Sequence, residues 1–175
     1  MDRFVGGHPA LDFVNTADGT GPVRASEHLP TWDAVLAWCR DAGLVDPAED
    51  VPAPADPASA LAALRAFRED LHAFLTAGGR AGAVRAAVVA AHARSRLDPS
   101  SGWTVPVAEH GADVPALRIT LAVGALLAGP DLARVSRCGR CSWVFLDPSP
   151  SRRRRWCSMA TCGNRSKQDR LRQRQ

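Results

Sequence analysis

Four cysteines near the C-terminal end of the chain constrain its fold most. Cys138, Cys141, Cys157 and Cys162 follow the spacing C-x2-C-x15-C-x4-C. Two close pairs separated by a loop are typical of a tetrahedral zinc site, because four thiolates must converge on one ion. Four sulfur ligands leave no open coordination position, so the spacing predicts one structural Zn²⁺ and not a catalytic one. A segment this short buries little apolar area, and the metal must therefore supply much of its folding free energy.

Charge divides the chain into two unequal segments. Residues 134–175 carry 12 basic and two acidic side chains, a net charge of +10, whereas residues 1–133 carry 10 basic and 16 acidic side chains, a net charge of −6. This change of sign predicts a basic binding module, residues 134–175, joined to a body, residues 1–133. Arginine outnumbers lysine 21 to 1, so the position of the arginines is more informative than their number.

Hydrophobic periodicity predicts a mainly helical body. Thr31 is placed to cap a helix over residues 32–42, and apolar residues recur at steps of three and four from Leu61 to Leu75. A further alanine-rich helix is predicted over residues 81–95, and the proline-rich residues 45–57 are interpreted as an exposed linker.

Two segments between residues 103 and 121 have β character. Residues 103–107 and 117–121 could form a hairpin, although the second segment could equally begin a helix that runs to Ala128. The predicted fold class is α+β, with a predominantly helical N-terminal domain and a small C-terminal module that resembles a treble clef. In that module we expect a knuckle at Cys138–Cys141, a hairpin of strands 143–146 and 153–157, and a polar helix over residues 163–173.

The predicted polar helix has Leu171 as its only large apolar residue, so it cannot be a core helix. It is either solvated or docked on a polyanion, and the second interpretation fits the concentration of arginine in one small module. Arginine contacts phosphate through two parallel hydrogen bonds. Trp143 and Trp156 are expected to pack against the knuckle and not to stack on bases. The predicted nucleic-acid contacts are Arg153, Arg154, Arg155, Lys167, Arg170 and Arg174, with Arg165 either touching phosphate or bracing an aspartate.

The rest of the sequence gives weaker indications. His8, Asp12 and Asn15 lie close together and are candidates for a small ligand pocket, although a histidine beside one carboxylate is more often structural. The phosphate-binding glycine loops, the Gly-x-Ser-x-Gly pattern and the His-Glu-x-x-His pattern are absent from the sequence, so we do not expect an enzyme. With no secretory signal and a longest apolar run of Leu121–Gly129, the chain is expected to be cytoplasmic with no membrane partner.

Two stretches resemble known families. The run from Arg153 to Lys167, with the sequence RRRWCSMATCGNRSK, closely resembles the CGNR-type zinc finger. The run GGHPALDFVNT, which begins at Gly6, resembles the start of the ABATE domain, which precedes this finger in bacterial proteins described as stress-induced transcription regulators. The resemblance implies zinc binding by the four cysteines, and DNA binding. The turn Ser149-Pro150-Ser151 differs from the Ser-Arg-Asn-like stretch that the family has there. This difference affects the contacts expected of the turn and leaves the expected metal site unchanged.

Three functions remain open from the sequence. The favoured one is a regulator that binds duplex DNA through the zinc module, with a homodimer and an unknown small-molecule effector both conceivable for the body. The second is an RNA-binding or ribosome-associated protein that uses the same basic surface. The third is a small-molecule enzyme whose zinc module is purely structural.

Overall fold

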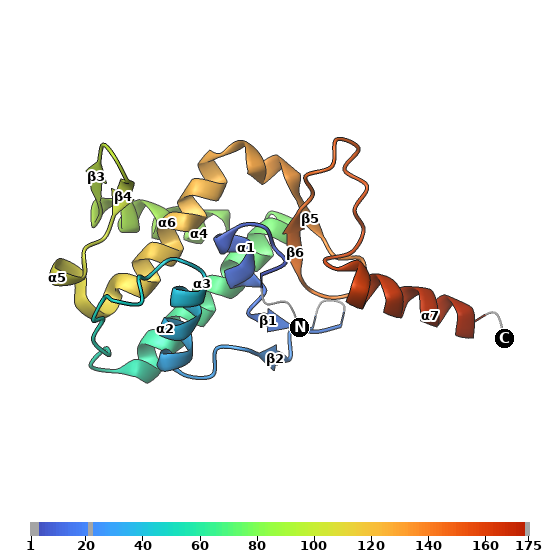
Figure 1. Cartoon of the computed structure of the whole chain (residues 1–175), viewed down its shortest axis with the longest axis horizontal. Coiled ribbons are helices and arrows are strands. Elements are labelled where there is room, and N and C mark those ends of the chain that lie inside the picture. The colour runs from blue at the N-terminus through green and yellow to red at the C-terminus, as the bar shows by residue number, and fades with distance from the viewer. Residues whose placement is uncertain (1–3, 21–22, 174–175) are drawn as a thin grey trace.

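A computed structural model describes residues 4–20 and 23–173, and helices dominate these ranges (Figure 1). The helices are α1 (Pro9–Val14), α2 (Trp32–Asp41), α3 (Pro57–Ala77), α4 (Ala81–Ala93), α5 (Val107–His110), α6 (Val114–Ala128) and α7 (Asn164–Arg172). Single turns of 3-10 helix lie at Gly111–Asp113 and Pro130–Arg134, and a π-helical turn lies at Met159–Gly163. The strands form three antiparallel pairs: β1 (Ala17–Asp18) with β2 (Ser26–Glu27), β3 (Arg96–Asp98) with β4 (Gly102–Thr104), and β5 (Val135–Arg137) with β6 (Val144–Leu146). The predicted α+β class is confirmed.

Local capping sets the ends of the body helices. The Thr31 hydroxyl accepts a hydrogen bond from the Ala34 amide at 3.2 Å, and the Asp56 carboxylate accepts one from the Ser59 amide at 3.0 Å. Gly78 ends α3 with φ +70°, a left-handed conformation that glycine adopts without steric cost. The predicted helices α2, α3 and α4 are confirmed, and α3 begins before its apolar pattern because Asp56 caps it.

Helix α1 lies in the centre of the body. Its residues Ala10 to Val14 are all buried, and it packs against α3 and α6. The Phe13 ring lies 5.9 Å from Trp38 of α2 and 6.3 Å from Phe67 of α3, measured between centroids. Cys39 is fully buried beside them, and burial raises the pKa of its thiol to about 12, as expected for an inert core residue.

Two predictions about the body are decided by the structure. Of the two interpretations of residues 117–121, the helical one is confirmed, because the segment belongs to α6, which runs to Ala128, and β4 pairs with the preceding β3 instead. Leu117, Ile119 and Leu121 are all buried, and an apolar run buried on several sides cannot be distinguished from a core strand by periodicity. The linker 45–57 has no strand, as predicted, but Val45 and Val51 are buried in the core and not exposed.

The continuous helical stretch Val107–Ala128 comprises α5, the 3-10 turn and α6. Among the described residues, it is the one helical stretch whose length and apolar composition would allow it to cross a membrane. A single such helix is weak evidence, because core helices pass the same test. Ile119, Val123 and Leu126 are at most 1% exposed and belong to the core of the body. We therefore describe α6 as a core helix.

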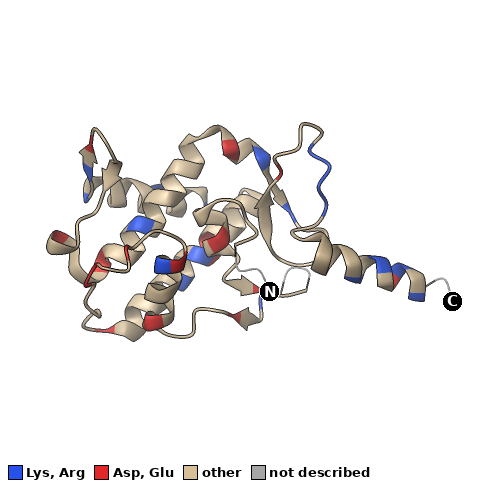
Figure 2. Cartoon of the chain, in the orientation of Figure 1, with Lys and Arg blue, Asp and Glu red and all other residues tan. Residues whose placement is uncertain are grey.

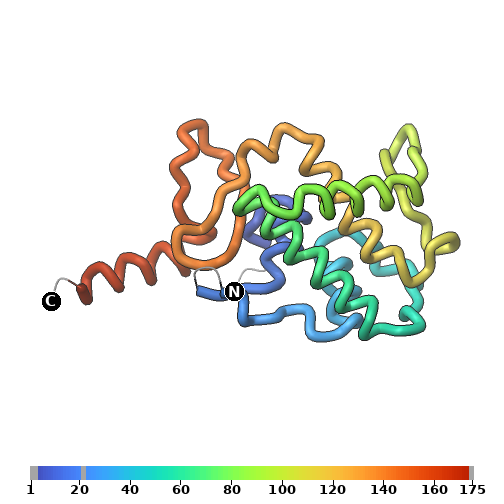
Figure 3. The backbone as a smooth tube through the Cα atoms, turned by 180° about the vertical axis from the view of Figure 1, so that it is seen from behind, coloured from blue at the N-terminus to red at the C-terminus, as the bar shows by residue number. Residues whose placement is uncertain are grey.

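The C-terminal module departs from the predicted hairpin. β6 pairs with β5, with Val135 opposite Leu146 and Arg137 opposite Val144, so the cysteine knuckle forms the tip of this hairpin. Residues 153–157, predicted as the returning strand, form no strand, because β5 occupies that edge of β6. An irregular loop follows β6 and leads to α7, which projects away from the body (Figures 1 and 3). The boundary between residues 133 and 134 stays a prediction.

Candidate metal centre and basic surface

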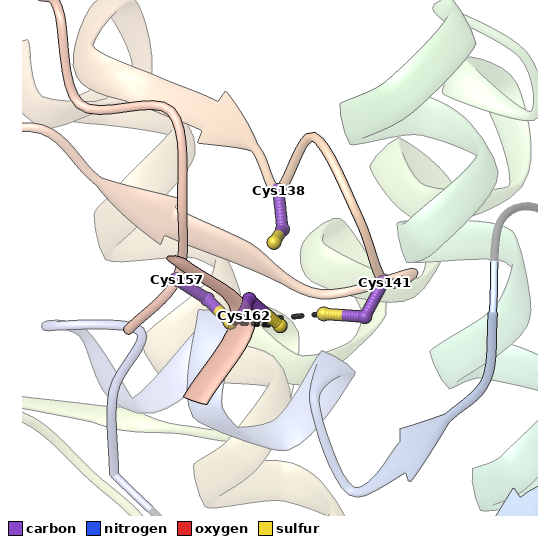
Figure 4. A group of neighbouring side chains, drawn as sticks. All are labelled: Cys138, Cys141, Cys157 and Cys162. Atoms are coloured by element: carbon purple, nitrogen blue, oxygen red, sulfur yellow. Dashed lines mark hydrogen bonds between the residues drawn. The ribbon is translucent and has the colours of Figure 1, made fainter. Parts of the chain in front are cut away.

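The four predicted ligands converge on one point. Their sulfur atoms all lie within 4.8 Å of one another and point inwards from the knuckle, the loop and the π-helical turn (Figure 4). Cys157 Sγ lies 3.6 Å from both Cys141 Sγ and Cys162 Sγ. A zinc ion with Zn–S bonds of about 2.3 Å in a tetrahedron would place its sulfurs about 3.8 Å apart. The site therefore fits one structural Zn²⁺, held by Cys138, Cys141, Cys157 and Cys162.

The proton chemistry of the sulfurs points to the same ion. Hydrogen bonds from the thiols of Cys141 and Cys157 lower the pKa of Cys138. The hydrogen bond to Cys138 in turn raises the pKa of Cys141, and those to Cys138 and Cys141 raise that of Cys157. Negative charges this close repel one another, so the cluster can become a set of thiolates only beside a cation. A divalent ion with a preference for sulfur meets this requirement.

Small residues and Trp156 hold the metal loops together. The Gly139 amide donates to the Arg155 carbonyl at 2.9 Å, and a β-carbon at Gly139 would lie 3.0 Å from the Trp156 ring. A β-carbon at Gly163 would also meet Trp156, at 3.2 Å. Trp156 therefore packs between the knuckle and the start of α7, and Trp143 is buried. The prediction that both tryptophans pack against the knuckle agrees with this geometry, and their not stacking on bases stays a prediction.

Two aspartates with arginine partners brace the module from within. Arg140 of the knuckle forms an ion pair with Asp169 of α7, which ties the projecting helix to the metal site. Asp147 is buried and accepts hydrogen bonds from Ser149 Oγ at 2.6 Å and from the Arg154 amide at 2.8 Å. The Ser149 hydroxyl is the main reason that the pKa of Asp147 is lowered. Arg165 is one candidate in the sequence for bracing an aspartate, but Arg140 is the residue that pairs with Asp169.

Arg154 has a structural role within the module, and its predicted contact with phosphate stays a prediction. Its guanidinium donates to the carbonyls of Leu146 at 3.2 Å and Trp156 at 3.0 Å, and also to that of Cys157. It lies over the Phe145 ring, 4.2 Å from the centroid. All three of its nitrogens are therefore engaged within the module, and its side chain holds the loop of residues 152–155 against β6.

The other predicted contacts that fall within the described residues are exposed, and several have no partner there. Arg170 makes only a long hydrogen bond, of 3.4 Å, to the Ser166 carbonyl, and Arg155 lies beside the Trp156 ring. Arg174 lies outside the described residues. Within residues 4–20 and 23–173, no hydrogen bond or ion pair engages the side chains of Arg153, Arg165, Lys167 and Arg172. Figure 2 shows these cations on the loop after β6 and along α7.

Asn15 joins the N-terminal segment to the zinc module. Its amide donates to the Val144 carbonyl at 2.8 Å and accepts from the Val144 amide at 2.9 Å, and both residues are buried. Further hydrogen bonds run from the Leu146 amide to the Gly6 carbonyl and from Trp143 Nε1 to the Ala17 carbonyl. The N-terminal segment therefore covers one edge of β6. Sequence reasoning missed this role, because the partner lies 129 residues away.

His8 and Asp12 also have partners within the chain. His8 Nδ1 caps α1 by accepting from the Ala10 amide at 3.1 Å. The Asp12 carboxylate accepts from the Gly6 amide at 2.7 Å, and burial raises the pKa of Asp12 to about 6. With Asn15 bound to Val144, the three side chains hold the N-terminal segment in place. That they also line a ligand pocket stays a prediction.

Together these features define a zinc-finger protein whose cationic finger is built onto a helical body. Comparison with known families finds these two parts in the same order: a model described as "CGNR zinc finger" matches residues 134–175, and one described as "ABATE: Putative stress-induced transcription regulator" matches residues 7–136. The chain belongs to the ABATE family and carries a CGNR zinc finger. No curated protein matches it by sequence. The family description names a regulator and no reaction, which suggests nucleic-acid binding in general terms.

Proposed function

We propose that this protein is a cytoplasmic, non-enzymatic regulator that binds duplex DNA through its zinc finger. One observation carries the proposal: among the described residues, most arginines of the body are paired with carboxylates, whereas most of those in the finger are not. Arg68 forms ion pairs with Glu27 at 2.7 Å and with Glu69 at 2.9 Å, and Arg118 pairs with Glu49. Arg94 and Arg96 of the body also have acidic partners. The cations of the finger are therefore free to contact an external anion.

The shape of α7 supports duplex DNA as that anion. The helix projects from the body (Figures 1 and 2), and its spacing puts Arg165 and Arg172 on one side and Lys167 and Arg170 on the opposite side. The major groove of B-form DNA, about 12 Å wide, admits an α-helix and has phosphates on both walls. The major groove of A-form RNA is too deep and narrow to admit an α-helix in this way. Such contacts give affinity without base specificity, so selective binding would require a dimer or a partner protein.

Salt-dependent binding of the zinc-loaded protein tests this proposal. Fluorescence anisotropy would be measured on a DNA duplex and on an RNA duplex of matched sequence, between about 50 and about 300 mM salt. The triple variant R153Q/K167Q/R172Q is expected to weaken DNA binding and to flatten the log–log salt slope by about one unit per lost phosphate contact. R85Q is the matched control, because Arg85 is an exposed cation on α4 of the body.

The outcomes separate the competing functions. Equal slopes for the triple variant and for R85Q would refute the assigned surface. A preference for the RNA duplex would favour the RNA-binding alternative. The absence of binding to either nucleic acid by the zinc-loaded protein would refute the proposal as a whole.

A further inference from the structure

A cavity of about 500 Å³ lies in the body, between α4, α6 and β4. It is formed by the middle of α6, the end of α4, β4 and the loop after α2, and its walls include Leu44, His92, Trp103, Leu121 and Ala125. Its volume falls in the range of about 300–1,000 Å³ that is typical of small-molecule sites. None of the residues assigned to the zinc finger lines it.

Helix α6 is left partly uncovered at this cavity. A helix that is apolar around its whole circumference is normally buried on all sides. The face of α6 with Ile119, Val123 and Leu126 is buried, but Ala125 on the opposite side is exposed and lines the cavity. Trp103 stands beside this face with 49% of its surface exposed, which is unusual for so large an apolar side chain. The cavity therefore offers a flat aromatic wall and an apolar floor.

His92 provides one directed hydrogen-bond acceptor in the wall. Its Nδ1 lies 2.9 Å from the Val88 carbonyl, which can only accept, so Nδ1 carries the proton in the neutral ring. Nε2 is then an acceptor, with no partner within the described residues. Gly124 makes room for the ring, since a β-carbon there would lie 2.7 Å from His92 Cε1. Trp103 packs edge-on against His92, 5.1 Å away, and fixes its orientation.

The positive charge of Arg118 at the cavity is already neutralised by Glu49. Arg118 lines the cavity, but its guanidinium donates to both Glu49 oxygens, at 2.5 and 2.6 Å. The remaining hydrogen bonds of Arg118 go to the carbonyls of Val105 and Leu44. With five donors engaged, this arginine has none left for a carboxylate or phosphate ligand. An anionic ligand would gain little here, and a neutral one is favoured.

We infer that this cavity binds a small, neutral, flat aromatic molecule that donates one hydrogen bond to His92 Nε2. Trp103 and the exposed face of α6 supply the apolar contact, and His92 selects for the donor. The inference does not depend on nucleic-acid binding by the finger, and the site is distinct from the His8, Asp12 and Asn15 group.

Two matched probes test the inference on the full, zinc-loaded chain. 2-Naphthol is neutral, flat and carries one hydroxyl donor, and 2-methoxynaphthalene has the same ring system without the donor. Isothermal titration calorimetry is expected to show 2-naphthol binding about tenfold more tightly, the difference of one hydrogen bond. H92F keeps a flat ring against Gly124 and should remove this preference. A125F fills the cavity from an exposed position and should abolish binding of both probes.

Three results would overturn the inference. Equal affinity of the wild-type protein for both probes would exclude the His92 contact, and unchanged binding by A125F would place the probes elsewhere. If sedimentation shows a wild-type dimer that A125F converts to a monomer, a second copy of the chain and not a ligand covers α6. Should H92F not fold, the A125F result and the comparison of the two probes still decide the question.

Discussion

Removing the Asn15 side chain tests how strongly the body and the finger depend on each other. In Asn15→Ala, the amide and the carbonyl of Val144 both lose their hydrogen-bond partner. In the wild-type protein, Asn15 is 3% exposed and Val144 is 0% exposed. Each buried backbone group left without a hydrogen bond costs about 1–3 kcal/mol. The variant should therefore lose about 2–6 kcal/mol, a large part of the about 5–15 kcal/mol that stabilises a typical domain.

Urea unfolding at constant free zinc, followed by circular dichroism, measures this loss. Asn164→Ala is the matched control, because Asn164 is exposed and makes only a 3.2 Å hydrogen bond to the Ala160 carbonyl, so its loss should cost less than about 1 kcal/mol. Since β6 follows the knuckle directly, Asn15→Ala should also release zinc to a chromogenic chelator more readily. A stability within about 0.5 kcal/mol of wild type would refute the reasoning.

The remaining predictions concern Asp12, the zinc ion and Arg154. Because burial raises the pKa of Asp12 to about 6, above its unfolded value of about 3.9, its contribution to stability is present at low pH and is lost as the pH rises through 6. Asp12→Asn should stabilise the protein at pH 7 by up to about 3 kcal/mol and show little gain near pH 4; urea midpoints that shift equally at both pH values would contradict this. Zinc removal should lower the thermal midpoint of the helical signal by at least about 5 °C, because Val144 and Leu146 pack in the core of the body, and added zinc but not magnesium should restore it. Arg154→Gln should cost about 1–3 kcal/mol in urea unfolding through three lost hydrogen bonds, whereas Arg153→Gln should leave stability unchanged; equal effects would refute the distinction.

Local chemistry made the helices and the metal ligands predictable. The cap at Thr31 and the glycine at 78 act within a few residues, so α2 and α3 could be read from the sequence. The cysteine spacing is equally local in effect, since both pairs must bend around one ion. For the helix ends and the metal ligands, residues close together in the sequence determine the structure, so both could be predicted from the sequence.

Long-range partners could not be predicted in the same way. Strand 143–146 was expected to pair with residues 153–157, but β5 precedes the knuckle and takes the same edge, a choice that side-chain alternation does not encode. Arg153 and Arg154 are neighbours of the same residue type, yet only Arg154 reaches three carbonyls, because the loop turns its side chain toward β6. Asn15 looked like a pocket residue because nothing near it in sequence indicates Val144.

The edge of β6 held by the N-terminal segment has a practical consequence for protein engineering. A fusion built from residues 134–175 alone would bind its metal with Trp143, Val144 and Leu146 uncovered, and such a fusion is expected to aggregate. A transplantable finger would have to include the stretch around Gly6–Gly19 on a tether, or carry polar replacements along that strand.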